Sequence, residues 1–365
     1  MSKKTPFYER HKKLNAKMVT FAGYNMPISY TSIKEEHQKV RNTAGVFDVS
    51  HMGEFLVKGK GAKDFLQFLT VNDVSQLSDG QAQYSAMCYP DGGIVDDLII
   101  YRFSSRKFMM VVNASNIDKD LSWVRQHVPD NAEITNVSDK TALLAVQGPK
   151  CLTVLQKLTG IELKNIGFYH FTEGKLAGRH MIISRTGYTG EPGFELYHDP
   201  EDALHLWDKL FENGKEIGLA PAGLGARDTL RIEMKYALYG NDIDKNTNPV
   251  EGGLSWITKL DKGDFIGRTA IKKVKEEKPR RRLIAFKMLE RGIPRPGYPL
   301  YTDEKAVGRV TSGTMSPTLN IGIGLAYVDR SFAKSGNELF LDSRGKRLRA
   351  KVIKPPFVDS SPLSL

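Results

Sequence analysis

The chain has 365 residues, more than one ordinary core accommodates, and this length predicts two or three domains. Its hydrophobic share of 40% and charged share of 26% are typical of a folded protein and argue against disorder over most of the chain. Two cysteines, Cys88 and Cys151, are too few for a disulfide framework or a four-ligand zinc site. No segment approaches the ~18 apolar residues of a membrane span, and the charged N-terminus lacks the apolar stretch of a signal peptide. We therefore expect a cytoplasmic protein that does not enter a membrane.

The net charge of +11 is unevenly distributed. Residues 261–365 hold 22 of the 53 basic residues and only 11 of the 42 acidic ones, so the rest of the chain is balanced. A basic pole of this kind attracts nucleic acid, an acidic membrane surface or an acidic protein, although a solvated face near a domain junction is an equally good interpretation. No aromatic residues are interleaved with the basic ones, which argues against a platform for single-stranded nucleic acid.

Strands and helices alternate in the first 260 residues. Short apolar runs predict strands at residues 54–60, 97–103, 108–113, 141–146 and 180–185. Apolar spacing of three and four residues predicts helices at 61–70, 116–127, 149–158 and 200–217. The long crossovers of a doubly wound sheet are missing. This region is therefore predicted to be α+β, with largely antiparallel sheets.

The C-terminal third has a different pattern. Residues 261–282 are polar and charged, contain Pro279 near their end, and are predicted to be a linker. Short strands separated by Gly- and Pro-rich turns follow, at 283–288, 308–312, 323–328, 338–341 and 350–353. This spacing predicts a small all-β barrel or sandwich.

The first chemical motif is a hairpin within residues 84–98. A tight turn, Pro90-Asp91-Gly92-Gly93, leads into an apolar strand that begins with two adjacent carboxylates, Asp96 and Asp97. Because side chains alternate along a strand, the two carboxylates point to opposite faces and at most one faces a given pocket. Such a carboxylate is suited to receiving a proton or stabilising a developing cation. The structural alternative is a turn with a surface charge.

A second motif, residues 185–196, is a glycine-rich loop that leads into a strand. Its glycines allow the backbone to approach a ligand, Tyr188 offers a stacking face, and Glu195 can accept paired hydrogen bonds from an amino-substituted heterocycle. The alternative is an ordinary glycine-rich hairpin.

A third motif begins a helix at residues 223–233. Arg227 could bind a ligand carboxylate through two hydrogen bonds. The alternative is a helix in which the arginines pair with Asp228 and Glu233.

Other sites are not expected. The eight histidines show no HxxxH or HExxH spacing, so a metal site is not predicted. Gly59-Lys60-Gly61 lacks the third glycine of a dinucleotide fingerprint, so nicotinamide binding is not predicted either.

Together these motifs resemble the aminomethyltransferase family, the T proteins of the glycine cleavage system. The likeness runs in order from end to end. Its segments are Phe47-Asp48-Val49-Ser50-His51-Met52-Gly53, Gly92-Gly93-Ile94-Val95-Asp96-Asp97-Leu98, Arg185-Thr186-Gly187-Tyr188-Thr189-Gly190-Glu191, Gly225-Ala226-Arg227-Asp228-Thr229-Leu230-Arg231, Leu238-Tyr239-Gly240-Asn241-Asp242, Gly292-Ile293-Pro294-Arg295 and Thr311-Ser312-Gly313-Thr314-Met315-Ser316-Pro317-Thr318.

The resemblance implies a three-domain cloverleaf around a folate-binding channel. Residues 1–52 and 142–260 would form a discontinuous folate-binding domain, 53–141 a second α+β domain that carries the Asp96 hairpin, and 283–365 the β barrel. The family transfers the methylene of an aminomethyl group, held on the lipoyl arm of the H protein, to tetrahydrofolate. The products are 5,10-methylenetetrahydrofolate, ammonia and dihydrolipoyl H protein.

The resemblance also implies roles for single residues. Asp96 would be the catalytic carboxylate, Glu195 would hold the pterin edge, and Arg227 would meet the folate tail. Tyr84, Asn113, Tyr188 and Arg295 would be further substrate-binding residues. Tetrahydrofolate is the expected co-substrate, with no metal, flavin or nicotinamide. The H protein is the expected docking partner, the P and L proteins are fellow members of the system, and no nucleic acid or membrane is expected. A non-catalytic folate-binding accessory or regulatory protein is the alternative.

Overall fold

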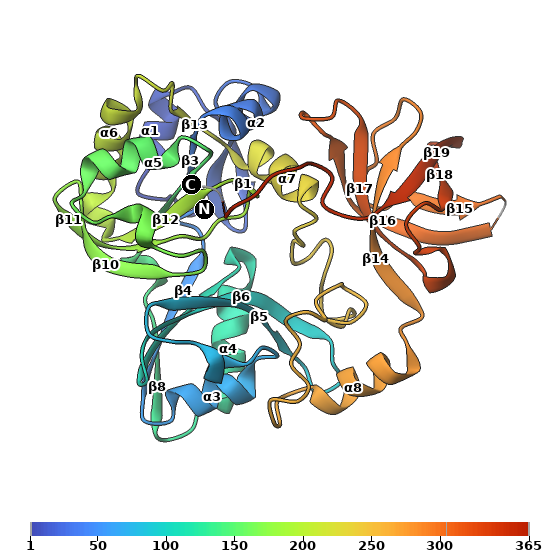
Figure 1. Cartoon of the computed structure of the whole chain (residues 1–365), viewed down its shortest axis with the longest axis horizontal. Helices are drawn as coiled ribbons and strands as arrows, with labels where there is room; N and C mark the ends of the chain where they lie inside the picture. The colour runs from blue at the N-terminus through green and yellow to red at the C-terminus, as the bar shows by residue number, and fades with distance from the viewer. Residues whose placement is uncertain (1, 304, 364–365) are drawn as a thin grey trace.

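The computed structural model describes residues 2–303 and 305–363. Their helices and strands form three groups around a common centre (Figure 1). We call these groups the first unit, the second unit and the barrel. No helix in the described part of the chain is long and apolar enough to cross a membrane.

The first unit is built on a six-stranded sheet with the strand order β10-β11-β12-β9-β3-β13, in which only the β3–β13 pair is parallel among the described strands. Its strands are β3 (Gly45–Asp48), β9 (Ala142–Gln147), β10 (Phe171–Leu176), β11 (Arg179–Ser184), β12 (Gly193–His198) and β13 (Ala220–Pro221), and the hairpin β1 (Lys17–Phe21)–β2 (Tyr24–Ser29) lies beside them.

Helices cover both faces of this sheet. They are α1 (Tyr8–Lys13), α2 (Ile33–Asn42), α5 (Cys151–Leu155), α6 (Ala203–Gly214) and α7 (Leu224–Glu233). The stripe predicted on the 200–217 helix is confirmed, because Ala203, Leu206, Trp207 and Leu210 are all buried in the core that this sheet forms with α5. On the other face, α7 packs against α2 and β2.

The second unit has a five-stranded antiparallel sheet with the order β5-β6-β7-β4-β8. Its strands are β4 (Gly53–Gly59), β5 (Gln81–Cys88), β6 (Ile94–Ser104), β7 (Lys107–Val112) and β8 (Ala132–Asn136). Helices α3 (Ala62–Leu69) and α4 (Ile117–His127) pack on one face through a core that includes Leu98 and Ile100. The alternate residues of the same strand, such as Tyr101, pack against the first unit. Each face of β6 therefore has a different neighbour.

The C-terminal strands close into a six-stranded barrel with the order β14-β17-β16-β15-β18-β19. The strands are β14 (Arg281–Met288), β15 (Pro299–Thr302), β16 (Lys305–Met315), β17 (Gly322–Asp329), β18 (Glu338–Ser343) and β19 (Lys346–Ile353), and the β14–β19 pairing completes the ring. The predicted small barrel is confirmed.

The predicted linker at 261–282 is wrong in one respect, since it contains helix α8 (Arg268–Glu277). Ile271 of α8 is fully buried in a core with Cys88 and Ile94 of the second unit. The exposed side of the helix carries two pairs spaced by four residues, Lys272–Glu276 and Lys273–Glu277. So short a helix needs only one or two apolar side chains to anchor it. The segment is therefore mostly charged, and its composition resembles that of a linker.

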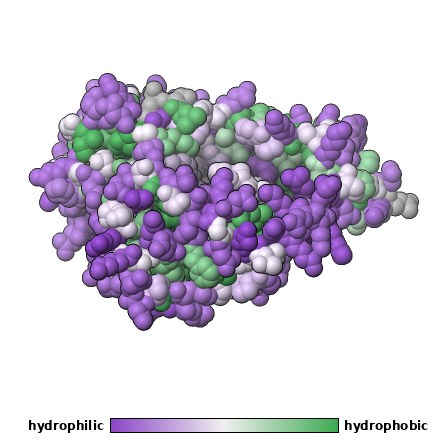
Figure 2. Space-filling model, turned by 60° about the horizontal axis from the view of Figure 1, so that its bottom comes forward, coloured by the Kyte–Doolittle hydropathy of each residue, from purple (hydrophilic) through white to green (hydrophobic). Residues whose placement is uncertain are grey.

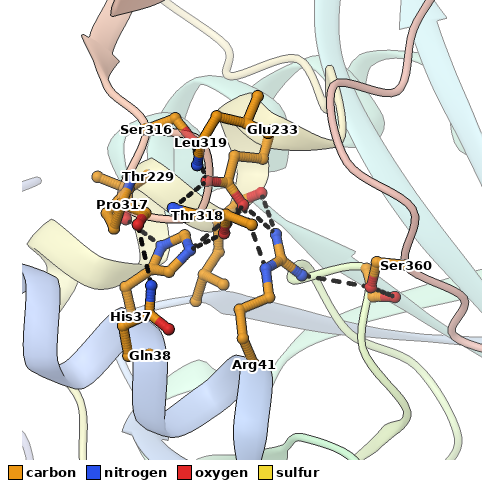
Figure 3. A network of polar contacts seen from close by, with 12 residues as sticks. His37, Gln38, Arg41, Thr229, Glu233, Ser316, Pro317, Thr318, Leu319 and Ser360 are labelled. Atoms are coloured by element: carbon orange, nitrogen blue, oxygen red, sulfur yellow. Dashed lines mark hydrogen bonds and ion pairs between the residues drawn. The ribbon is translucent and has the colours of Figure 1, made fainter. Parts of the chain in front are cut away.

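A buried polar network joins the first unit to the barrel (Figure 3). Glu233, at the end of α7, accepts hydrogen bonds from Arg41 Nη2 at 2.8 Å, Ser316 Oγ at 2.5 Å and Thr318 Oγ1 at 2.9 Å, and His37 Nε2 lies 3.2 Å away. Arg41 also reaches Ser360 in the C-terminal segment at 3.4 Å. We call this carboxylate and its partners the Glu233 junction. The junction holds α2, the barrel and the C-terminal segment against α7.

The outer surface in the view of Figure 2 is mainly hydrophilic, with hydrophobic residues in small separate patches. Among the described large hydrophobic residues, Trp256 is one of the most exposed, at 62%.

Candidate active site

A cavity of about 500 Å³ lies where the first unit, the second unit and the loop after α7 meet. Its wall is rich in aromatic side chains, among them Tyr84, Tyr169, Tyr188, Tyr197, Tyr236 and Trp256. Five charged or amide side chains also line it: Asp97, Asn113, Glu195, Arg227 and Lys235. An apolar, aromatic cavity with a few converging polar groups is the usual form of a small-molecule site.

Asp97 is the carboxylate of the hairpin that lines this cavity. The turn before it forms as predicted, with Gly92 at a φ of +87° that suits glycine. Tyr84 Oη donates a hydrogen bond of 2.8 Å to Asp97 Oδ2, and Asn113 Nδ2 donates one of 2.9 Å to Asp97 Oδ1. Each carboxylate oxygen thus has one donor and retains capacity for another.

Asp96 does not line this cavity, and its expected orientation toward the ligand is wrong. It is fully buried on the side of the sheet that α4 covers. There it accepts hydrogen bonds from the backbone N–H of Asn113 at 3.0 Å, from Asn113 Nδ2 at 2.9 Å and from Asn116 Nδ2 at 2.7 Å. Asp96 and Asp97 lie on opposite faces of β6, as the alternation of side chains along a strand predicts. Helices cover the face that carries Asp96, and the cavity lies on the face that carries Asp97.

The two neighbouring carboxylates alter each other's ionisation. Burial, together with the negative charge of Asp96, raises the pKa of Asp97 to about 7. Burial also raises the pKa of Asp96, although hydrogen bonds from Asn113 and Asn116 oppose this effect. A carboxyl group that titrates near neutral pH is suited to accept and release a proton at the working pH.

Glu195 lies on β12, on the cavity wall. The hydroxyl group of Thr186 donates a hydrogen bond to Glu195 Oε2, and no described residue donates one to Oε1. Behind Thr186 a chain of buried hydroxyls continues to Tyr101 at 3.2 Å and from there to Tyr197 at 3.0 Å. Burial raises the pKa of Glu195. The carboxyl group is therefore held through one oxygen, while the other has no hydrogen bond among the described residues.

Arg227 has no ion pair or side-chain hydrogen bond among the described residues. Its guanidinium lies 4.4 Å from the centre of the Tyr188 ring, and the Tyr188 hydroxyl donates to the backbone oxygen of Ala237. The two carboxylates that could have paired with Arg227 have other partners. Asp228 pairs with Arg231 at 2.8 Å, and Glu233 belongs to the Glu233 junction. A desolvated guanidinium without a carboxylate partner is suited to bind an anionic ligand group.

A second cavity of about 620 Å³ adjoins the first, and Tyr188, Arg227 and Leu238 line both. Arg295 lies on the wall of this second cavity and not on that of the first. The structure thus brings Tyr84, Asn113, Tyr188, Glu195 and Arg227 together around one cavity, while Arg295 lies in its neighbour.

Sequence reasoning missed Tyr236 and Trp256 as cavity residues. Tyr236 stacks on Tyr188 with ring centres 5.7 Å apart, and Trp256 stacks on Tyr84 at 6.0 Å. Both lie in irregular segments where no periodicity separates a wall residue from an ordinary loop residue. Within residues 2–303 and 305–363, no group of three His, Cys, Asp or Glu side chains is arranged to hold a metal ion.

Two family models match most of the chain. The GCVT N-terminal domain matches residues 7–262, and the glycine cleavage T-protein C-terminal barrel domain matches residues 281–359. The fold and the cavity thus define a protein of the T-protein class.

Relatives agree over the full length. The chain is 51% identical over 356 residues to an aminomethyltransferase of Halothermothrix orenii, covering 98% of this chain and 100% of the relative. It is 54% identical over 358 residues to an aminomethyltransferase of Bacteroides fragilis, covering 97% and 99%. The crystal structure of glycine cleavage system aminomethyltransferase T from Bartonella henselae matches with a TM-score of 0.93 at 33% identity, covering 99% of both chains. The chain therefore belongs to the aminomethyltransferase family, the glycine cleavage T proteins.

The resemblance inferred from the motifs and the predicted α+β fold with a C-terminal barrel are thereby confirmed, as is the prediction that the chain is a transferase.

Proposed function

We propose that this chain transfers the methylene of an aminomethyl group, carried on the lipoyl arm of an H protein, to tetrahydrofolate in the cavity of about 500 Å³. The products are 5,10-methylenetetrahydrofolate, ammonia and the dihydrolipoyl arm. A cytoplasmic location and the P and L proteins as fellow members of the system are part of the same proposal.

One observation carries the proposal. A single aromatic cavity is lined by Asp97, Glu195 and Arg227, and Arg227 has no ion pair within the described part of the chain. Glu195 offers a free oxygen to the amino-substituted edge of a pterin, and Arg227 offers two N–H groups to a carboxylate of the folate tail. The aromatic walls provide the flat apolar surfaces on which a pterin and a benzoyl ring stack.

Asp97 is the residue to which we assign the chemistry. Loss of ammonia from the aminomethyl group leaves a cation-like carbon still bound to the lipoyl sulfur, and attack by a folate nitrogen then produces a positively charged nitrogen that must release a proton. Attack by the second folate nitrogen breaks the carbon–sulfur bond, and the departing lipoyl thiolate takes up the proton that this second nitrogen releases. A carboxylate beside the reacting atoms stabilises the cation-like carbon electrostatically and accepts the proton of the first nitrogen. Asp97 has a raised pKa and spare acceptor capacity on both oxygens, so it suits both steps.

Asn113 and Tyr84 position this carboxylate. Each donates to a different oxygen of Asp97, so the plane of the carboxylate is fixed before substrate binds. Preorganised groups of this kind lower the reorganisation that the reaction would otherwise require.

The test is ammonia release from H protein loaded with the aminomethyl group, measured with and without tetrahydrofolate. The proposal expects release that depends on tetrahydrofolate, with formation of 5,10-methylenetetrahydrofolate in equal amount. Binding of tetrahydrofolate without turnover would instead support a non-catalytic folate-binding accessory or regulatory protein.

A further inference from the structure

A third buried carboxyl group lies beneath the two of the hairpin. Asp120, on α4, is fully buried. Neither of its carboxyl oxygens accepts a hydrogen bond from any N–H or O–H group of the described chain. Asn116, one turn before Asp120 on the same face of the helix, donates to Asp96 at 2.7 Å, and this places the Asp120 side chain beside the Asp96 carboxyl group.

Two carboxyl groups can hydrogen-bond each other only if one of them carries a proton. Asp96 accepts three N–H hydrogen bonds, from the backbone and side chain of Asn113 and from Asn116, and these favour its ionised form. Asp120 accepts none, and a buried carboxylate without donors is strongly disfavoured. The proton therefore belongs on Asp120.

The surroundings of Asp120 agree with this assignment. Lys119 is the nearest cation, with Nζ 3.7 Å from Asp120 Oδ1, but it donates to the backbone oxygen of Val95 and lies over the Tyr239 ring. Burial raises the pKa of both Tyr89 and Tyr239, which lie on neighbouring elements, and a negative charge on Asp120 would raise each further. Burial, reinforced by the charge of Asp96, raises the pKa of Asp120 to about 11, so the group is neutral at physiological pH.

We propose that Asp120 is a positioning residue, which donates its carboxyl proton to Asp96 and so keeps Asp96 as the anion that orients Asn113 toward Asp97. The inference rests on the function proposed above, because Asp97 is the group that it serves.

Asn113 transmits the effect. Its Nδ2 atom lies 2.9 Å from Asp96 Oδ1, 2.9 Å from Asp97 Oδ1 and 3.1 Å from the backbone oxygen of Asp97, so its two protons are shared between the two aspartates. Turning the amide over would place its oxygen against both carboxylates, which is repulsive while Asp96 is an anion. If Asp96 took up a proton of its own, it could donate to that oxygen, and the donor to Asp97 would be lost.

Replacement of Asp120 separates the possible roles. Asp120→Asn supplies a permanent N–H donor of nearly the same shape, so it should keep the turnover number within about threefold of the wild type. Asp120→Ala removes the donor and should lower the turnover number about tenfold or more, with little change in the KM for tetrahydrofolate. Asp118→Asn, an exposed aspartate on the same helix, is the matched control.

A measurement that does not depend on turnover locates the proton. Infrared spectra of the full-length protein at neutral pH, taken as wild type minus Asp120→Asn, should show a protonated-carboxyl band that is absent from wild type minus Asp118→Asn. Other buried carboxyl groups, such as Glu54, whose pKa burial raises, cancel in these differences. A wild type minus Asp120→Asn spectrum without the band overturns the proposal, and so does full activity in Asp120→Ala. Equal losses in folded Asp120→Asn and Asp120→Ala would show that an ionised Asp120 is required, which also overturns it.

Failure of this proposal is distinguishable from failure of the proposed function. If the wild type shows no tetrahydrofolate-dependent turnover, the function is wrong, whereas the infrared band still reports where the proton lies. If Asp120→Ala does not fold, the band and the activity of Asp120→Asn still decide the question.

Discussion

The side chains of Tyr84 and Asp97, which lie on adjacent strands, are joined by a hydrogen bond of 2.8 Å from the tyrosine hydroxyl to Oδ2 of the carboxylate. Tyr84 also stacks against Trp256, and Asp97 Oδ1 is held by Asn113. The carboxylate is thereby fixed in a wall that is otherwise apolar, where its negative charge is poorly screened. A charge so placed acts strongly on a cation that develops beside it.

Asp97→Asn should lower the turnover number by ~10²-fold or more, because it removes the charge that stabilises the transition state and keeps the shape of the side chain. Tetrahydrofolate affinity and thermal stability should change little. Steady-state kinetics with loaded H protein and equilibrium binding of tetrahydrofolate measure the two effects. If Asp97→Asn kept its turnover and Asp96→Asn lost it, the sequence-based assignment of Asp96 would be right.

The acid side of the pH profile should report Asp97. Asp97 acts as the anion, so turnover is present above its pKa and is lost as the pH falls through about 7. Asp96→Asn removes a neighbouring negative charge, which lowers the pKa of Asp97 and should move the acid limb to lower pH. The measurement is the turnover number from pH 5 to 9, with Asp118→Asn as control. An acid limb that stays in place would mean that another group titrates.

Arg227→Ala should weaken binding of tetrahydrofolate mainly by removing a charge-assisted contact to its carboxylate tail. A folate analogue without the glutamate tail should bind the wild type more weakly, and the variant should lose little further affinity for it. Binding constants for the four combinations of protein and ligand give the coupling directly. Equal losses in both proteins on removal of the tail would count against this contact.

The Glu233 junction should make stability depend on pH in the acid range. Burial alone would raise the pKa of Glu233, but hydrogen bonding and charge from His37, Arg41 and Ser316 lower it from 4.5 to about 2. Because the pKa of the folded state is the lower one, the stabilisation is present above about 4.5 and is lost as the pH falls toward 2.

Glu233→Gln should therefore reduce the free energy of unfolding at neutral pH by about 3 kcal/mol, since it leaves His37 without its carboxylate and Arg41 with Glu191 alone. It should also reduce the dependence of stability on pH in that acid window. Denaturant unfolding at several pH values measures both effects. Glu212→Gln, which removes an exposed partner of Lys209, is the control and should change stability little. Equal effects of the two substitutions would show that the junction is not a stabilising centre.

The basic C-terminal third should face an acidic H protein, with Arg291 and Arg295 nearest the mouth of the cavities and the residues 272–282 at the rim. Charges at the rim act mainly on the association rate and on its salt dependence. Arg281 is unsuited to a test, because it pairs with Glu251 at 3.0 Å and supports the fold. Lys275, Arg280 and Arg282 are exposed or nearly so and have no ion pair among the described residues, so their joint replacement by Ala is the better variant.

This variant should raise the KM for loaded H protein at ~20 mM salt and lose the difference from the wild type near ~300 mM, where the Debye length is much shorter. Replacement of three exposed lysines outside this region, Lys58, Lys60 and Lys140, is the matched control. A KM that responds neither to salt nor to the C-terminal substitutions would assign the basic pole to a solvated face.

Much of the fold was predictable because it depends on local patterns. The buried face of α6 follows from spacing within one helix, and the short strands of the barrel follow from regular turns. Helix α8 was not predictable in this way. Its anchor is Ile271, and the pocket that receives Ile271 is made by Cys88 and Ile94, almost two hundred residues earlier.

The sequence by itself determined that the hairpin after Gly92 presents two carboxylates on opposite faces of one strand, because side chains alternate with the pleat of a strand. It also determined that a glycine-rich loop precedes Glu195 and that Arg227 lies near the start of a helix. Only the tertiary structure decided which carboxylate meets the cavity. That choice depends on which face α4 covers, and the packing of α4 is settled by contacts across the second unit. The tertiary structure likewise left Arg227 without an ion pair to any described residue, since Arg231 and Arg41 occupy the carboxylates that could have neutralised it.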